Sequence, residues 1–428
     1  MSLQDSFIYL PLSMKDLTKT RLELLLLFIL MIVIMPLRHS EIDFEFWTNW
    51  ALKIHRDGLV NVYNDSSVNY HPVYLYILYL YDLVQGSEYL IKGNINHLKM
   101  FGLVFDFLPI VVLCAFRQNI IKEKIPYLFL LLNIAYLFNS MIWGQVDSVH
   151  TNLSFLALLF AFTNPLLSGF LFAVAIGTKL QAIIFLPILV IIWLYSIRNV
   201  KTLIGLLLII SGTLFIICLP FILAGTFGQL WQVVTGAVGK YPVVSIGAFN
   251  IWYLIAEGDL GSTLDSSIYF ILTYKQLGLL LFLIASTIVL LPMLFRMARL
   301  RLSNVSITTD TQKLLMLTGG LIALCFFYFN TQMHERYATG IVIYFFFYGI
   351  FSKNYTLYIL ASISYFLTLD KCFPDYLPIV HYKIIFASKV IAIWYTITLA
   401  YAFYEFFRQY KVMDEWKLLR ESGNTKSK

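Results

Sequence analysis

Carboxylates that stand beside apolar sequence are the first candidates for chemistry in this chain. Asp147 lies in the stretch NSMIWGQVDSVHT, which separates two apolar runs and also holds Gln145 and His150. A carboxylate in lipid costs several kcal/mol unless it faces water or a partner. The stretch therefore indicates a polar site at one face of a membrane protein, or alternatively an ordinary polar loop between two helices.

A second acidic pair, Asp43 and Glu45, follows the first apolar run of the chain. A carboxylate here could act as a general base that removes the proton of an acceptor hydroxyl. Asp43 is the stronger candidate, because the segment that follows it has the pattern of an amphipathic helix that would hold it at the membrane interface. The alternative is a pair of solvated loop charges.

Cationic residues stand beside apolar sequence at two further points. Lys179 interrupts the stretch AVAIGTKLQAIIFLP, where a lysine either extends to the interface or meets an anion. His334, Glu335 and Arg336 follow the apolar run that ends at Asn330. Arginine suits a two-point contact with phosphate and protonated histidine can donate to it, so the cluster predicts phosphate binding or, alternatively, a charged helix end.

Two other features carry weaker signals. The segment 245–252 (SIGAFNIW), which includes Asn250 and Trp252, combines small and aromatic residues after Lys240. It fits a surface that contacts a sugar or a lipid, and it fits an aromatic belt at the membrane interface equally well. Asp106 lies in the middle of an apolar run, and we expect it to be a buried, partnered carboxylate with a structural role.

The composition is that of a polytopic membrane protein. Of 428 residues, 59% are hydrophobic and 13% are charged, and the mean hydropathy is +0.76. The net charge of +7 is expected to mark cytoplasmic loops, so no nucleic-acid partner is inferred. The four cysteines form no CxxC pair and no Cys/His cluster, so the sequence supports neither a disulfide framework nor a zinc site.

Apolar runs of near-helical length recur along the chain. The runs are 22–37, 98–116, 125–142, 149–162, 166–177, 183–195, 203–224, 277–295, 314–329, 337–351, 356–369 and 384–407. They predict an all-α polytopic membrane protein with about 12–13 transmembrane helices.

Two segments of the N-terminal part do not fit a simple crossing. The stretch 70–84 is apolar and aromatic but only 15 residues long, so a re-entrant or surface-lying path is favoured over a full crossing, which needs about 20. Residues 46–55 (FWTNWALKIH) have helical spacing of aromatic residues with charges opposite. They predict an amphipathic helix on the membrane surface within the first external loop, 38–69.

Basic residues follow alternate runs, and the positive-inside rule places them in the cytoplasm with both chain ends. These residues are Arg117, Lys122, Lys124, Arg198, Lys201, Arg296, Arg299, Arg301, Lys353, Arg408 and Lys411. The same orientation gathers Asp43, Asp147, Lys179, the long loop 226–275 and the cluster 334–336 on one non-cytoplasmic face. The basic residues alone set this topology, so the convergence of these five features on one face predicts an active site there.

A carboxylate and several cations beside lipid suggest one reaction. A lipid-phosphate sugar would bind with its tail in the bilayer and its phosphate against Arg or Lys. The carboxylate would deprotonate an acceptor hydroxyl, which attacks the anomeric carbon while the lipid phosphate leaves. Such a single displacement inverts the anomeric centre. The chain has neither GxGxxG nor a P-loop, and this reaction needs no nucleotide-binding loop.

Four segments in order resemble the motif set of GT-C-fold glycosyltransferases, in particular bacterial relatives of the second mannosyltransferase of GPI-anchor assembly. The segments are WGQVDS from Trp143, KLQAI from Lys179, SIGAFNIW from Ser245 and MHERY from Met333. The stretch 70–74 (YHPVY) also resembles the Tyr-Pro-Pro segment of the family, with His71 in place of one proline. The motifs are specific for the superfamily and not for the sugar.

The resemblance implies a polyprenyl- or dolichyl-phosphate sugar donor and an extracytoplasmic active site. It places the catalytic acidic residue of the first external loop at Asp43 and a second acidic site residue at Asp147, which would orient the acceptor or a metal. Residues expected to bind the donor phosphate or lipid-linked sugar are Lys179, His334, Arg336 and Gln145. Residues expected to contact the acceptor or the sugar are Glu45, Tyr70, His71, Trp143, His150, Asn250, Trp252 and Glu335.

The sequence thus predicts an inverting glycosyltransferase, with mannose favoured as the sugar. The acceptor (a glycan, a lipid-linked oligosaccharide or a protein residue) stays open, and so does dependence on a divalent metal; no other cofactor is implied. The alternatives are a multi-span transporter or lipid-linked-glycan flippase, and a non-catalytic scaffold. The membrane would be the bacterial inner or plasma membrane, or the ER membrane in a eukaryote.

The expected organisation has five parts along the chain. A cytoplasmic segment 1–21 precedes a GT-C transmembrane module, 22–224. The long external loop 225–276 leads to a variable C-terminal transmembrane module, 277–407, and a cytoplasmic tail, 408–428.

Overall fold

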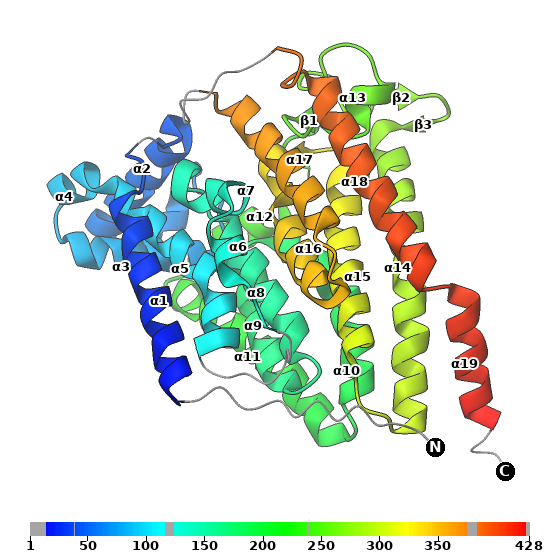
Figure 1. Cartoon of the computed structure of the whole chain (residues 1–428). Coiled ribbons are helices and arrows are strands. Elements are labelled where there is room, and N and C mark those ends of the chain that lie inside the picture. Colours follow the sequence, from blue (N-terminus) through cyan, green and yellow to red (C-terminus); the bar gives the residue numbers. More distant parts are fainter. Residues whose placement is uncertain (1–13, 38, 116–123, 238, 375–382, 425–428) are drawn as a thin grey trace.

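The structure, a computed structural model, describes residues 14–37, 39–115, 124–237, 239–374 and 383–424 (Figure 1). Arg117 and Lys122, most of the predicted cytoplasmic segment 1–21 and the end of the tail 408–428 lie outside these residues.

Helices make up nearly all of the regular structure. The α-helices are α1 (Met14–Val33), α2 (Glu41–Asp57), α3 (Pro72–Gln85), α4 (Glu88–Gly93), α5 (Leu98–Ile110), α6 (Tyr127–Leu131), α7 (Ile134–Leu137), α8 (Asp147–Phe160), α9 (Pro165–Thr178), α10 (Leu186–Ser196), α11 (Val200–Leu223), α12 (Phe227–Thr235), α13 (Trp252–Ile255), α14 (Tyr274–Ser303), α15 (Thr309–Phe329), α16 (Thr339–Ser352), α17 (Thr356–Cys372), α18 (Ser388–Gln409) and α19 (Val412–Asn424). The 3₁₀ turns are η1 (Leu59–Asn64), η2 (Ile95–His97), η5 (Leu180–Phe185) and η6 (Glu335–Ala338), and the π-helical turns are η3 (Val111–Ala115) and η4 (Phe138–Trp143).

The predicted apolar runs coincide with helices. The run 125–142 does not form one continuous helix, because it is divided into α6, α7 and the π-helical turn η4. Asn133 lies at the division, and its side chain accepts a hydrogen bond from the backbone N–H of Ala135. An asparagine that caps a new helical turn in this way interrupts the preceding one.

Five helices of the described residues are long and apolar enough to cross a membrane: Ile95–Cys114, Val200–Leu223, Tyr274–Ser303, Thr309–Phe329 and Ser388–Glu421. Shorter apolar helices accompany them at Ile134–Trp143, Pro165–Thr178 and Leu180–Ser196. The chain is therefore an all-α membrane protein, as predicted. The count of about 12–13 crossings and the orientation in the membrane stay predictions.

The bundle is built around helices that are buried on all sides. Every residue of α8 is buried, and α15 and α16 are buried over most of their lengths. By contrast, α11 exposes apolar side chains along most of its length, as expected for a helix that faces lipid. Figure 1 shows α14, α15 and α18 running side by side, with the strands at one end of the bundle and α19 toward the other.

The predicted amphipathic helix is α2, but its aromatic face does not lie on a membrane surface. Phe44, Trp47 and Trp50 are buried within the protein, and the helix packs against α3. The predicted amphipathic pattern of this helix is confirmed. Its apolar face is covered by the protein and not by lipid, because α3 and η1 supply an apolar surface. The segment 70–84 forms α3, whose 14 residues span about 21 Å, too short for a hydrocarbon core of about 30 Å.

The long loop 226–275 contains secondary structure of its own. Strand β1 (Ser245–Ile246) pairs in parallel with β4 (Met333–His334), and β2 (Ile268–Tyr269) forms a hairpin with β3 (Leu272–Thr273). The β1–β4 pair joins two of the sequence motifs directly, because it places the SIGAFNIW segment beside the segment that holds His334.

Candidate active site

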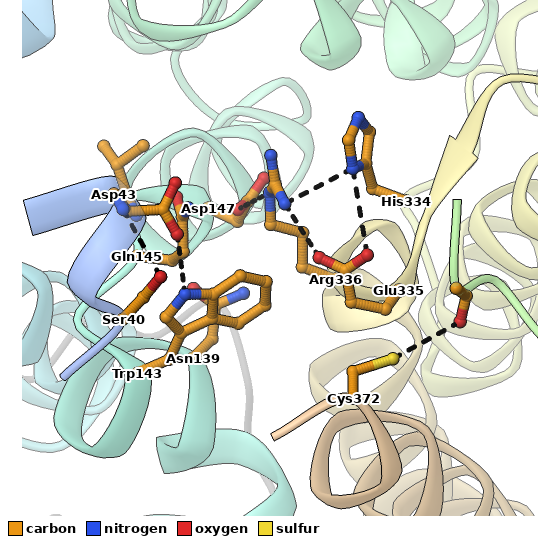
Figure 2. Close-up of polar contacts among 12 residues, drawn as sticks. Ser40, Asp43, Asn139, Trp143, Gln145, Asp147, His334, Glu335, Arg336 and Cys372 are labelled. Atoms are coloured by element: carbon orange, nitrogen blue, oxygen red, sulfur yellow. Dashed lines mark hydrogen bonds and ion pairs between the residues drawn. The ribbon is translucent and has the colours of Figure 1, made fainter. Parts of the chain in front are cut away.

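Asp43 lies in the first turn of α2, where Ser40 caps the helix. Its Oδ2 accepts a hydrogen bond of 2.8 Å from the indole Nε1 of Trp143 (Figure 2). Trp143 is buried at the end of η4, whereas the Asp43 side chain is only half-buried. Among the described residues, no group donates to Asp43 Oδ1, so that oxygen is free to meet a substrate.

Gly144 allows α2 to lie this close to Trp143. Its φ is 88°, in the left-handed region, and a Cβ at this position would lie 2.5 Å from ring atoms of Phe44. Only glycine adopts this backbone without strain and leaves room for the aromatic ring. The Trp-Gly-Gln motif thus has a geometric role, because Gly144 lets the first turn of α2 lie against the end of η4.

Asp147 is fully buried at the first position of α8 and is held by cations. Lys179 donates to its Oδ1, and Arg336 Nε lies 3.4 Å from its Oδ2. His150, one helical turn along α8, places Nε2 3.4 Å from Oδ1. The helix N-terminus also favours negative charge at this position.

Arg336 contacts two carboxylates of the site, those of Asp147 and Glu335. Besides its contact with Asp147, its Nη1 donates to Glu335 Oε1 at 2.8 Å, and its guanidinium lies 5.2 Å from the centre of the Trp143 ring. Figure 2 shows the guanidinium between Asp147 and the His334–Glu335 pair, with the indole nitrogen of Trp143 directed toward Asp43. The four motifs of the sequence therefore meet at one place.

The backbone at Gly247, directly after strand β1, passes close to Glu335. The backbone at Gly247 has φ 69°, and a Cβ there would lie 3.0 Å from Cys372 Sγ and 3.3 Å from Glu335 Oε2. Gly247 thus permits the SIGAFNIW segment to pass directly beside the Glu335 carboxylate.

Tyr70 closes the site on the side of α3. Its hydroxyl donates to Gln145 Oε1 at 3.2 Å. Burial raises the pKa of Tyr70, so the hydroxyl keeps its proton and acts as a donor.

The imidazole of His334 is buried beside Glu335 and Arg336. Burial lowers its pKa, and the adjacent Arg336 charge lowers it further. Its Nδ1 lies 3.5 Å from Arg336 Nη1 and 3.8 Å from Glu335 Oε2. That His334 contacts the donor phosphate stays a prediction, and a phosphate beside the ring would favour its protonated form.

Several buried polar atoms around the site have no hydrogen-bond partner among the described residues. They are Asn139 Oδ1, Gln145 Nε2, His150 Nδ1 and His334 Nε2. Buried polar atoms are normally paired, so a cluster of such atoms indicates a place where water or a ligand binds.

Some predicted contact residues are exposed or have partners within the protein. Glu45 is exposed to solvent, and the His71 ring contacts the backbone carbonyl of Ile176. Asn250 and Trp252 hydrogen-bond to carbonyls at the end of α15, at Phe327, Phe329 and Asn330. These contacts give both residues a structural task, because the last carbonyls of a helix lack partners within it.

Two tyrosines of the site were not predicted. The Lys179 ammonium lies 4.4 Å from the centre of the Tyr337 ring, and Tyr365 donates to the backbone carbonyl of Arg336 at 3.3 Å. Tyr337 is the last residue of the MHERY motif, and an aromatic residue next to Arg336 is a usable signal for a contact with a cation. Tyr365 lies in α17 within an ordinary apolar run, and the sequence contains no signal for it.

Asp106 is buried and partnered, as predicted. It accepts hydrogen bonds from Ser140 and from Asn152 Nδ2, the latter at 3.3 Å. Ser140 belongs to η4, so this contact fixes the turn that ends at Trp143.

Within the described parts of the chain, no group of three or more His, Cys, Asp or Glu has the arrangement of a metal site. Both oxygens of Asp147 face cationic side chains, and the arrangement therefore assigns Asp147 to holding Lys179 and Arg336.

The chain matches no protein-family model, and no curated protein is significantly similar to it. The fold and the site define the class as an all-α membrane protein with a charged cluster buried at one end of its helical bundle.

Proposed function

We propose that this protein is an inverting glycosyltransferase that moves a sugar from a polyprenyl-phosphate donor to an acceptor hydroxyl. One observation carries the proposal: Trp143 holds Asp43 by its N–H while its ring lies under Arg336. A half-buried carboxylate with one free oxygen thereby stands beside a cationic group, which is the arrangement that single displacement of a lipid phosphate requires.

Asp43 is the general base of this proposal. Its free oxygen takes the proton of the acceptor hydroxyl as the acceptor oxygen forms a bond to the anomeric carbon. The bond between that carbon and the phosphate oxygen breaks, and polyprenyl phosphate leaves with the electron pair. The anomeric centre is inverted because the two bonds lie on opposite faces of the sugar.

Arg336 and Lys179 stabilise the departing phosphate. In the resting site they contact Asp147 and Glu335, and these carboxylates hold both cations in place without a ligand. Phosphate oxygens would share the remaining donors of the guanidinium and the ammonium. Asp147 is not the base in this scheme, because both its oxygens face cations.

The lipid environment and the resemblance to GT-C enzymes support the same donor class and a GT-C fold. The helices around the site are apolar, so a polyprenyl chain has a compatible medium beside it. Mannose is the proposed sugar on the resemblance alone. The site would open to the extracytoplasmic or lumenal side, according to the distribution of basic residues in the sequence.

The test is a transfer assay with purified protein in nanodiscs. Polyprenyl-phosphate mannose or polyprenyl-phosphate glucose is added with a pool of glycan, lipid-linked and peptide acceptors. We expect release of polyprenyl phosphate and a glycosylated product of inverted configuration with one donor. Movement of a lipid-linked glycan across liposomes, without release from any donor, would instead favour the transporter or flippase.

A further inference from the structure

The tip of the β2–β3 hairpin is an apolar surface that the proposed function does not use. The side chains of Ile268, Phe270 and Ile271 are 75%, 85% and 94% exposed. Figure 1 shows the hairpin projecting from the end of the bundle that carries β1, beside the start of α14. Large apolar side chains grouped at one exposed point mark a contact surface.

The backbone conformation of the turn also indicates a function for the exposed side chains. Tyr269 pairs with Leu272, so Phe270 and Ile271 form a two-residue turn, and Phe270 has φ 60°. A positive φ at the first turn position is typical of glycine, and a bulky residue adopts it at a cost. Phenylalanine in this position places an aromatic ring at the outermost point of the loop.

The hairpin is rigidly attached, so its tip has a fixed position. The Tyr269 ring lies 4.9 Å from that of Tyr274 and 6.2 Å from that of Trp252, and its hydroxyl donates to the carbonyl of Ile255. Thr273 then begins α14 with a capping box.

The start of α14 locates the tip relative to a bilayer. Lys275 and Arg296 bracket the apolar part of this helix, which spans about 30 Å between them and so matches a hydrocarbon core. Lys275 therefore stands at a membrane boundary. The tip is a few residues away, roughly 10 Å from Thr273 along an extended strand, which is comparable with the depth of the interfacial layer.

We propose that Ile268, Phe270 and Ile271 insert into the interfacial layer of the lipid bilayer and anchor the loop 226–275 there. Aliphatic and aromatic side chains at this depth exchange contact with water for contact with acyl chains. The occupant is lipid because the surface continues directly into a membrane-spanning helix, whose exposed apolar side chains begin at Leu279.

The anchor also has a consequence for the charged site. Trp252, against which Tyr269 packs, belongs to the same segment as β1, and β1 pairs with the strand that holds His334. A hairpin fixed in the interface therefore holds the SIGAFNIW segment at a constant depth. This inference does not rest on glycosyl transfer, and its test does not measure transfer.

The experiment places the photoreactive residue p-benzoylphenylalanine at Phe270 or, separately, at Ile271 of the full chain in phosphatidylcholine–phosphatidylglycerol nanodiscs. After irradiation, adducts are identified by mass spectrometry. Leu283, exposed in the middle of α14, is the positive control, and Glu257, exposed in the same loop, is the matched negative control.

We expect acyl-chain adducts at both tip positions, with yields within about threefold of that at Leu283, and none at Glu257. Using two positions guards against one variant that folds poorly. Lipid adducts at Leu283 but at neither tip position would overturn the proposal. Adducts at the tip that join two protein chains in place of lipid would overturn it as well, in favour of a protein interface.

Discussion

The indole N–H of Trp143 donates to Asp43 Oδ2 at 2.8 Å, and the same ring lies 5.2 Å from the guanidinium of Arg336. One side chain thus positions both the proposed base and a proposed phosphate ligand, although the two residues are far apart in sequence.

Replacing Trp143 by Phe removes the donor and retains an aromatic ring over Arg336. A hydrogen bond to a charged group contributes about 1.5–3 kcal/mol, so the loss predicts a fall in kcat of roughly 10- to 100-fold with little change in donor KM. Steady-state kinetics of the transfer reaction measure both constants. Trp231→Phe, at an exposed tryptophan of α12, is the control and should leave kcat unchanged. A normal kcat in Trp143→Phe would show that the indole does not position the base.

Gly144→Ala tests whether α2 must lie against the end of η4. The added methyl forces an L-residue into a left-handed backbone, at about 1–2 kcal/mol, and collides with the Phe44 ring, at about 1–3 kcal/mol more. Gly58→Ala is matched to it, because Gly58 has φ 82° and nothing within 4 Å of the added Cβ. We expect both variants to lose thermal stability and only Gly144→Ala to lose activity. Equal activities in the two variants would contradict the packing role of Gly144.

Lys179→Met leaves the fully buried Asp147 without its nearest cation. Removal of one partner of a buried pair destabilises by about 3–5 kcal/mol, so the thermal midpoint should fall clearly. In the double variant Asp147→Asn/Lys179→Met the uncompensated charge is gone, and most of the midpoint should return while transfer activity does not. A double variant as unstable as the single one would mean that the two groups are not coupled.

The lowered pKa of His334 predicts a pH dependence of stability. Because the folded pKa lies below the unfolded value of about 6.5, the unfolded state binds more protons in the interval between them, and stability falls as pH drops below about 6.5. His334→Gln removes this component, so the thermal midpoint should fall less between pH 7.5 and 5.5 than in the wild type. His97→Gln, at an exposed histidine, serves as the control. An unchanged pH dependence in His334→Gln would show that His334 is not buried as a neutral ring.

Much of the helical architecture could be predicted from the sequence. Apolar runs bounded by charged residues form helices in lipid, because a helix pairs its backbone polar groups within the segment. The break at Asn133 could not be read from hydropathy, since it depends on one local hydrogen bond. The buried face of α2 was misassigned to the membrane, because an apolar helical stripe does not specify whether lipid or protein covers it.

The candidate site was predictable to the extent that its residues interrupt apolar sequence. Asp147, Lys179 and Arg336 each do so, and the structure brings them into direct contact. The functions of Gly144 and Gly247 and the contribution of Tyr365 depend on close approaches between distant segments, which no local pattern encodes. The sequence also cannot reveal that Asn250 and Trp252 bind helix-end carbonyls, because these carbonyls are about 80 residues away. Without that information, the sequence predicts both residues as ligand contacts.

The most direct test of the account compares Asp43→Asn with the wild type in the transfer assay. Asparagine has nearly the shape of aspartate but cannot accept the proton of the acceptor hydroxyl, so release of polyprenyl phosphate should fall by about 10²- to 10⁴-fold. Glu41→Gln, at an exposed carboxylate two residues earlier in α2, is the matched control and should remain active. The thermal midpoints of all three proteins should agree. Full activity in a folded Asp43→Asn would contradict the assignment of Asp43 as the base.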